Sequence, residues 1–206
     1  MSKRQSNATM QSEIFIVLMI VMVLLFIITS FYISKLKEHQ QPPLIVLDEA
    51  HGYSFSSSSA LLNNNFSTQL EKTVIQEIQD FSKKYKCDTV EIYGYTDGQP
   101  FSVNTARSTQ SFDKALHKCL VEQGCDIDAI QTSSNLELGM KRAVSVVEFL
   151  KPRLLNKAPS YIKTIRPYSG GAFIDAKGKI AKIDDTKGNK YRRRIEIRLS
   201  RSHDLR

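Results

Sequence analysis

Residues 14–33 form an unbroken apolar run without a charge, a proline or a glycine. As an α-helix, a run of about 20 residues is roughly 30 Å long, which matches the hydrocarbon core of a bilayer. Its polar residues, Thr29 and Ser30, can each return a hydrogen bond to the preceding turn. The pattern predicts a transmembrane helix over 14–33, with a tail over 1–13 before it and a polar tether over 34–43 after it.

A cleaved signal peptide is the competing interpretation of this run. The apolar core of a signal peptide is shorter, about 7–15 residues, and ends at small side chains. Here the run ends at Phe31, Tyr32 and Ile33, which are bulky. We therefore expect a retained anchor. Basic residues lie on both sides of the run, so the positive-inside rule leaves its orientation open.

Strand-like and helix-like patterns alternate along the remaining residues, 44–200. Short apolar or alternating runs predict strands at 44–47, 89–93, 161–165 and 194–199, and a further short strand or extension around Tyr53 and Phe55. Apolar residues spaced three and four apart predict helices over 66–81, capped by Asn64 or Asn65, and over 136–150, starting near Asn135 and ending before Pro152. The expected fold is therefore α+β, a mixed β-α-β-α-β-β sheet with helices on one face.

Two stretches interrupt this order. Residues 99–134 show weak periodicity, and we treat them as an insert in which Phe112, Leu116 and Leu120 indicate one modest helix ending near Gly124. The polar stretch 175–189 contains two glycines and predicts a loop, and residues 201–206 form a short tail.

The chain has three cysteines, Cys87, Cys119 and Cys125. One disulfide with one thiol left over and a bridge between two chains are both open; within the chain we favour the pair Cys119 and Cys125, which flanks a predicted helix end. The spacing does not resemble a zinc site, and the four histidines form no cluster in the sequence. With no nucleophile–base set in view, we expect neither a cofactor nor an enzyme.

Three short motifs lie at the ends of predicted elements. The segment GYTD (94–97) follows a strand, NLELGMKRA (135–143) opens a helix, and RRIEI (193–197) forms the last strand. In this order they resemble the G-H-T-D, N-x-x-L-S-x-x-R-A and N-R-R-V-E-I segments of the OmpA-like peptidoglycan-binding domain. Residues 55–61, FSSSSAL, are similar to a further segment of that family, F-x-x-x-S-A-x-L. The resemblance covers about 44–200.

This resemblance implies a ligand and a set of binding residues. The family holds the diaminopimelate side chain of the peptidoglycan stem peptide, which carries both an ammonium and a carboxylate. On this basis Asp97 would accept the ammonium and Arg142 would hold the carboxylate with its guanidinium fork. Asn135, seven residues before Arg142, and Thr96 would line the same pocket. Without the resemblance, Asp97 is typical of a turn and Arg142 of an exposed helix face.

The chain also departs from the family pattern. Tyr95 replaces the histidine, Gly139 the serine and Arg192 the asparagine. The spacing of 45 residues between Asp97 and Arg142 is much longer than the family's. The insert must therefore loop out and return if the two residues are to share a pocket.

The chain carries a formal net charge of +8, and after Met140 it has 18 Lys and Arg residues against 6 acidic ones. The arginine triplet 192–194 would suit a nucleic-acid face, but no aromatic residues are interleaved with it. A solvated basic surface is the plain alternative. We expect attraction to anionic cell wall or phospholipid headgroups rather than a nucleic-acid partner.

Glu13 lies directly before the apolar run. Stator B subunits of the flagellar motor class, their transport relatives and the similar subunit of the Zorya phage-defence system share a layout: a short cytoplasmic tail, one transmembrane helix with an early acid, and a periplasmic domain. A carboxyl at membrane depth has a raised pKa and can load and release ions, so Glu13 is the ion-carrying candidate. Alternatively, Ser12 caps the helix and Glu13 complements the helix dipole.

Together these observations predict a single-pass protein of the bacterial inner membrane with its C-terminal domain in the periplasm. The preferred interpretation is a stator-like subunit that binds peptidoglycan, forms a homodimer and works with a MotA/ExbB-like multi-span subunit, in motility, transport or antiviral defence. The alternative is a passive peptidoglycan anchor without ion conduction. A cytoplasmic nucleic-acid binder on a membrane tether is a third, less favoured class.

Overall fold

A computed structural model describes residues 2–38, 42–56, 58–100, 111–122, 125–155, 160–182 and 188–202. The chain divides into two compact units, Met1–Gln41 and Pro42–Arg206. Parts of the predicted tether, of the insert, of the loop over 175–189 and of the C-terminal tail lie outside the described residues, as does Gly124.

The first unit is the helix α1 (Ser2–Glu38), in which Glu13–Leu36 is long and apolar enough to cross a membrane. The Thr29 hydroxyl donates a hydrogen bond to the carbonyl oxygen of Leu25 at 2.8 Å, which satisfies this polar group within the apolar helix. The helix is longer than predicted at both ends, because the tail is helical from Ser2 and the tether is helical as far as Glu38. Residues 2–13 and 34–38 contain no proline or glycine that would end a helix.

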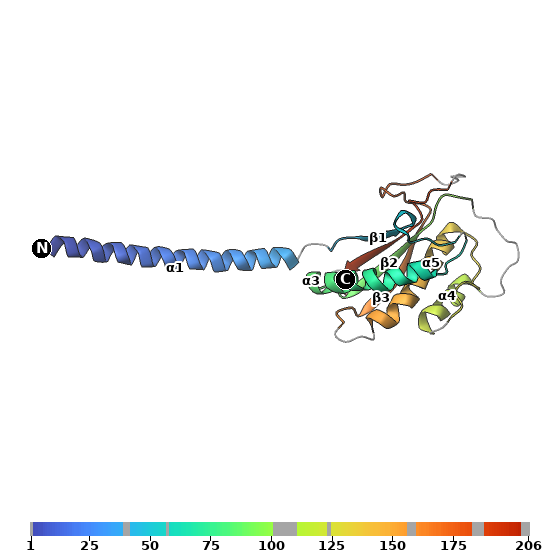
Figure 1. The fold of residues 1–206 in the computed structure, drawn as a ribbon, viewed down its shortest axis with the longest axis horizontal. Coiled ribbons are helices and arrows are strands. Elements are labelled where there is room, and N and C mark those ends of the chain that lie inside the picture. The colour runs from blue at the N-terminus through green and yellow to red at the C-terminus, as the bar shows by residue number, and fades with distance from the viewer. Residues whose placement is uncertain are drawn as a thin grey trace. The chain divides into compact units, whose positions relative to one another are not determined.

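The second unit is built on a four-stranded mixed sheet with the order β1-β4-β2-β3 (Figure 1). Its strands are β1 (Ile45–Asp48), β2 (Thr89–Tyr95), β3 (Thr164–Gly171) and β4 (Arg194–Ser200). Strands β2 and β3 are parallel, whereas β4 is antiparallel to both β1 and β2. The first and last strands of the domain are thus neighbours.

Helices cover one face of this sheet (Figure 1). They are α2 (Asn64–Gln69), which continues through a π-helical turn (η2, Leu70–Val74) into α3 (Ile75–Tyr85), then α4 (Phe112–Val121) and α5 (Asn135–Leu154). The side chains of Ile92 and Ile197 point from the sheet into a core that they share with Ile78 and Val147 of the helices. Residues that alternate with them, such as Glu196, lie on the other face. The predicted α+β class with helices on one face is confirmed.

Two local predictions were wrong. Tyr53 and Phe55 form no strand; their rings pack edge-to-face against Phe66, at centroid distances of 5.2 and 5.1 Å. Aromatic packing rather than strand pairing therefore explains their alternation. The helix that follows is capped by Asn63, whose Oδ1 accepts the Phe66 N–H at 2.8 Å, and not by Asn64 or Asn65.

The later elements also shift. Pro152 lies inside α5 rather than beyond it, because burial of Leu150 and Leu154 outweighs the hydrogen bond that a proline removes. Strand β3 begins at Thr164 and continues to Gly171, several residues later than the predicted 161–165. Helix α5 and strand β3 are thus present as predicted, with shifted ends.

Helix α5 crosses β2 at a contact between two glycines. A methyl group added at Gly94 would overlap the carbonyl oxygen of Gly139, and one added at Gly139 would lie 2.7 Å from the carbonyl oxygen of Gly94. The backbones therefore touch directly. This contact brings the first turns of α5 beside the segment that follows β2, where Asp97 lies.

We expect Gly94→Ala to lower the free energy of unfolding by about 3 kcal/mol, the upper end of the usual overpacking range. The melting temperature of the full chain in detergent would fall by roughly 6–12 °C, as followed by circular dichroism. Gly178→Ala is the control, since Gly178 has no neighbouring atom within 4 Å and a φ of +76°, so only backbone strain changes there. Equal melting temperatures for Gly94→Ala and the wild type would contradict the close contact.

Candidate functional site

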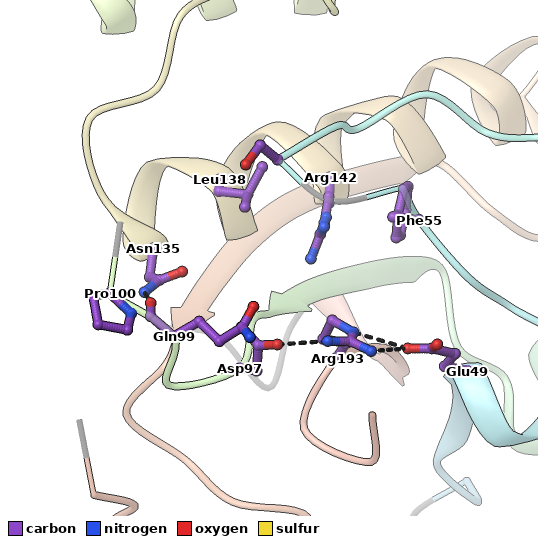
Figure 2. A pocket seen from close by; sticks show the side chains of 10 residues that line it. Glu49, Phe55, Asp97, Gln99, Pro100, Asn135, Leu138, Arg142 and Arg193 are labelled. Carbon is purple, nitrogen blue, oxygen red and sulfur yellow. Dashed lines mark hydrogen bonds and ion pairs between the residues drawn. The ribbon is translucent and has the colours of Figure 1, made fainter. Parts of the chain in front are cut away.

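A pocket of about 530 Å³ lies where α5 begins and β2 ends. Its lining residues come from five separate parts of the domain: Glu49, Phe55, Ser58, Asp97, Gln99, Pro100, Asn135, Leu138, Arg142 and Arg193 (Figure 2). Asp97 and Arg142 are therefore brought together although 45 residues separate them. The pocket is polar, with two acidic and two basic side chains among its lining.

Arg142 projects from α5 into this pocket and is 3% exposed. Its Nε donates to the carbonyl of Ser59 at 3.0 Å and its Nη2 to the carbonyl of Ser56 at 3.3 Å, while the guanidinium lies 4.9 Å from the centre of the Phe55 ring. Both hydrogen-bond acceptors are neutral. No carboxylate among the described residues pairs with this cation, and its Nη1 is left without a partner there.

Burial lowers the pKa of Arg142 to about 10, although the nearby Asp97 acts in the opposite direction. The group is still protonated at neutral pH, so the pocket holds a desolvated positive charge. Such a charge is costly unless an anion reaches it. The arrangement therefore favours an anionic group of a ligand.

Across the pocket, Arg193 connects two carboxylates (Figure 2). Its Nη1 donates to Oδ2 of Asp97 at 2.6 Å, and its Nε and Nη2 donate to Oε2 of Glu49 at 2.8 and 2.5 Å. Burial alone would lower the pKa of Arg193, but the hydrogen bonds to Glu49 and Asp97 outweigh it and hold the pKa above its ordinary value. Oδ1 of Asp97 has no partner among the described residues, and this oxygen can accept a further donor.

The four charges of the pocket cancel. Glu49 and Asp97 supply two negative charges, and Arg142 and Arg193 supply two positive ones. Because Arg193 is engaged by both carboxylates, the groups left for a ligand are the Arg142 cation on one wall and an oxygen of Asp97 on the other. A ligand that carries one ammonium and one carboxylate matches this arrangement in sign and in total charge.

Asn135 and Thr96 take different places at the edge of the pocket. Asn135 lines it, and its Nδ2 donates to the carbonyl of Gln99 at 2.9 Å. Thr96 is 1% exposed and does not line the pocket; its hydroxyl contacts the carbonyl of Asn135 at 3.5 Å, and its N–H donates to Gly171 at 2.8 Å. We therefore assign Thr96 to the support of the pocket rather than to its surface.

Each arginine of the triplet 192–194 forms hydrogen bonds or ion pairs within the domain. Arg192 donates to the carbonyls of Ala172 and Lys182 at 2.6 and 3.1 Å, and Arg193 serves the pocket. On the sheet face opposite the helices, Arg194 pairs with Glu196 at 2.8 Å. The triplet is thus not an exposed basic strip.

Tyr95, which stands where the resembling family has histidine, also lies away from the pocket. Its hydroxyl contacts Glu196 at 3.3 Å, and the Arg194 guanidinium lies 3.9 Å from the centre of its ring. The side chain therefore belongs to the open face of the sheet, on the other side from Arg142. Tyr95 is therefore not one of the residues that line the pocket.

Sequence reasoning missed Glu49 as a pocket residue. The strand pairing of the structure brings it there: Asp48 lies opposite Arg194 in the antiparallel β1–β4 register, so Glu49 and Arg193 come next to each other beyond it. The motif comparison had included Arg193 without a role.

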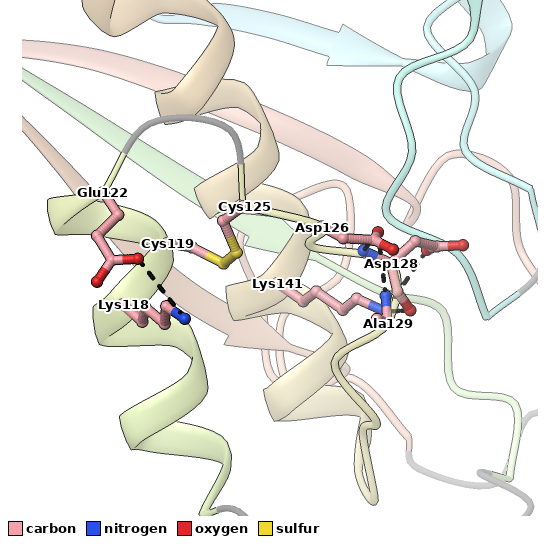
Figure 3. The surroundings of a disulfide bond; sticks show 8 residues. All are labelled: Lys118, Cys119, Glu122, Cys125, Asp126, Asp128, Ala129 and Lys141. Atoms are coloured by element: carbon pink, nitrogen blue, oxygen red, sulfur yellow. Dashed lines mark hydrogen bonds and ion pairs between the residues drawn. A yellow bond between two sulfur atoms is a disulfide. The ribbon is translucent and has the colours of Figure 1, made fainter.

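The remaining candidate residues lie elsewhere. Because α1 begins at Ser2, Ser12 is not at a helix start and Glu13 is about three turns inside the helix, so the capping interpretation of these residues was wrong. Cys119 and Cys125 form a disulfide between the end of α4 and the segment after it (Figure 3). The Cys87 thiol is buried and contacts the carbonyl of Tyr85 at 3.6 Å.

Comparison with known proteins gives structural likenesses only. No family model and no curated protein matches the sequence. Among solved structures, the chain is similar to a MotB-like protein from Desulfovibrio vulgaris, with 15% identity and a TM-score of 0.41 over 77% of this chain and 74% of the other. It is also similar to the cell wall anchor of the T6SS from Pseudomonas aeruginosa, with 17% identity and a TM-score of 0.41 over 77% and 81% of the two chains.

A third similar structure is the OmpA-like domain of FopA1 from Francisella tularensis subsp. tularensis SCHU S4, with 18% identity and a TM-score of 0.36 over 76% and 75% of the two chains. At these identities and TM-scores, the likenesses assign neither a ligand nor a partner to this chain.

Proposed function

We propose that residues 42–206 bind peptidoglycan by holding the diaminopimelate side chain of its stem peptide. The observation that carries this proposal is Arg142, a buried cation without an anionic partner among the described residues, facing Asp97 across a pocket of zero net charge. The end of a diaminopimelate side chain bears an ammonium and a carboxylate on one carbon. It therefore supplies both missing partners at once.

Each pocket residue then has a role. Arg142 binds the carboxylate, with a planar fork that its bonds to Ser56 and Ser59 hold in place. Asp97 accepts the ammonium through Oδ1, while Arg193 holds the other oxygen. Glu49 engages Arg193 from the far side, so that Asp97 is not fully neutralised by it. These are binding roles, and the proposal includes no catalytic step.

The proposal extends to the membrane through α1. Its segment Glu13–Leu36 would anchor the chain in the inner membrane, with the binding domain in the periplasm where peptidoglycan lies. An acid inside such a helix supports a stator-like subunit that carries ions through Glu13, as a homodimer beside a MotA/ExbB-like multi-span subunit. The second candidate is a passive peptidoglycan anchor. It needs the same pocket and the same helix but no ion-carrying carboxyl.

A pelleting experiment tests the binding proposal. We expect the full chain in detergent to sediment with sacculi whose stem peptides contain diaminopimelate, and to sediment about tenfold less with sacculi that contain lysine, which lacks the second carboxylate. Free diaminopimelate should release the bound protein.

The chain's net charge of +8 makes a salt control necessary, because anionic wall polymers attract any basic protein. At about 1 M salt, where the Debye length is roughly 3 Å, the difference between the two kinds of sacculus should persist. Equal sedimentation with both kinds would overturn the diaminopimelate site.

A further inference from the structure

The orientation of Arg142 depends on the segment that contains Ser56 and Ser59, and neither of these two residues lies in a helix or strand. Two of the guanidinium nitrogens are fixed by carbonyl oxygens of this segment, at 3.0 Å to Ser59 and 3.3 Å to Ser56. A shift of these carbonyls would turn the fork, since its other contact among the described residues is the face of the Phe55 ring. Whatever holds this segment therefore holds the cation.

Asp128 holds the segment from the insert. Its Oδ1 accepts the hydroxyl of Ser59 at 3.1 Å and the N–H of Ala60 at 3.3 Å. Ser59 is thus bonded on both sides: its hydroxyl donates to Asp128, and its carbonyl accepts from Arg142. One residue of the insert is connected to the pocket cation through a single intervening residue.

Lys141 closes the connection back to α5. This residue precedes Arg142 in the helix and is 3% exposed, so a second positive charge is buried there. Its Nζ donates to the carbonyl of Asp128 at 3.0 Å and lies 3.5 Å from Oδ1 of the same residue (Figure 3). Burial would raise the pKa of Asp128, but hydrogen bonds from Ala60 and Ser59 and the charge of Lys141 hold it below its ordinary value. Asp128 is thus ionised at neutral pH.

The insert is itself fixed just before this residue. The Cys119–Cys125 disulfide closes the chain just before it, and Oδ1 of Asp126 accepts the N–H of Asp128 at 3.2 Å (Figure 3). Ile127 is buried against Leu116 of α4 and Val144 of α5. The turn that carries Asp128 is therefore a braced part of the domain.

We propose that Asp128 is a positioning residue for Arg142, so that the insert sets the direction of the guanidinium fork in the pocket. This inference rests on the proposed function, because it assigns the fork to the ligand carboxylate. Asp128 touches no ligand itself. Its effect passes through Ser59, and Lys141 keeps it in register with the helix that bears Arg142.

The test compares two ligands that differ only at the group that Arg142 binds. One is a stem tripeptide that ends in diaminopimelate with a free side-chain carboxylate, and the other is the same tripeptide with that carboxylate converted to a carboxamide. We expect the full chain in detergent to prefer the free carboxylate by about 30-fold, measured by titration calorimetry. In Asp128→Ala this preference should fall about tenfold, while affinity for the amide changes little.

Two further variants keep the result interpretable. Glu122→Ala removes an acid from the same insert, but Glu122 is exposed and its one ion pair among the described residues is with Lys118 at 3.6 Å, so the preference should stay at the wild-type value. Asp128→Asn keeps the shape and an acceptor for Ala60 while it removes the charge beside Lys141. It should fold like the wild type and lose about threefold of the preference, and it decides the question if Asp128→Ala does not fold.

The outcomes separate the two proposals. A wild-type chain that binds both tripeptides equally would overturn the proposed function. A wild-type preference that survives unchanged in the Asp128 variants would overturn the positioning role and leave the proposed function standing. If the Asp128 variants bound both tripeptides more weakly by the same factor, the positioning role would also be overturned. Such a result indicates a loosened fold, which weakens the binding of carboxylate and amide alike.

Discussion

Arg142→Ala is expected to reduce the affinity for a diaminopimelate-containing stem peptide by about 100-fold or more. Removing one member of a buried, hydrogen-bonded charge pair weakens a complex by about 2–5 kcal/mol, because the ligand carboxylate is then desolvated without a partner. Arg142 is 3% exposed and its two fixed hydrogen bonds go to neutral carbonyls, so it forms no ion pair with a carboxylate of the described residues. Titration calorimetry on the full chain measures the loss.

Stability should change much less than affinity in this variant. The buried guanidinium is itself unfavourable without an anion, which offsets the two hydrogen bonds that alanine removes. Arg142→Lys keeps the charge but loses the fork and the contact with Phe55, so its affinity should lie between those of wild type and alanine. Arg166→Ala, on β3 and away from the pocket lining, is the matched control. Unchanged affinity in Arg142→Ala would reject this residue as the carboxylate ligand.

Glu13→Gln is expected to abolish ion transfer and to leave membrane insertion intact. Glutamine keeps the size and polarity of the side chain but cannot release a proton. Glu13 lies inside α1 at the start of the apolar segment Glu13–Leu36, and in the proposed stator-like subunit its carboxyl would take up and release protons there. Proton uptake into liposomes that contain this chain together with a MotA/ExbB-like multi-span subunit, followed with a pH-sensitive dye, measures the effect.

The same experiment decides between the two candidate functions. Glu13→Asp retains a titratable group, and it should keep a substantial part of the flux. If Glu13→Gln conducts like the wild type while pocket variants still lose the cell wall, the chain is a passive anchor. If flux is lost in Glu13→Gln and retained in Glu13→Asp, the stator-like interpretation is supported.

The elements that were predicted well are those in which apolar residues recur at regular spacing because one face of the element is buried. Val90 and Ile92 of β2, and Ile195 and Ile197 of β4, alternate because one side of the sheet meets the helices. The repeat of apolar residues in α5 has the same cause with a different period. Local periodicity is sufficient to find such segments, and the family resemblance singled out Asp97, just after β2, and Arg142 on α5.

The features that were missed depend on contacts between distant segments. Pro152 stays helical because Leu154 beyond it is buried, which no local rule for proline contains. Glu49 reaches the pocket only because the first strand pairs with the last. Asp128 matters because its turn folds back on Ser59, almost 70 residues earlier in the chain. The pattern of residue types along the chain does not show which distant segments lie side by side. Glu49 and Asp128 could therefore be identified only from the structure.

The position of β4 in the sheet has a consequence for how the protein is made. This strand is the last in the chain, yet it lies between β1 and β2 and is the only strand bonded to β1 among the described residues. The sheet therefore cannot close until residue 200 has emerged from the ribosome, and until then the nascent domain lacks the strand that joins β1 to β2. The proposed periplasmic location would require the chain to stay unfolded while it crosses a secretion channel, and this topology delays folding until β4 has been made.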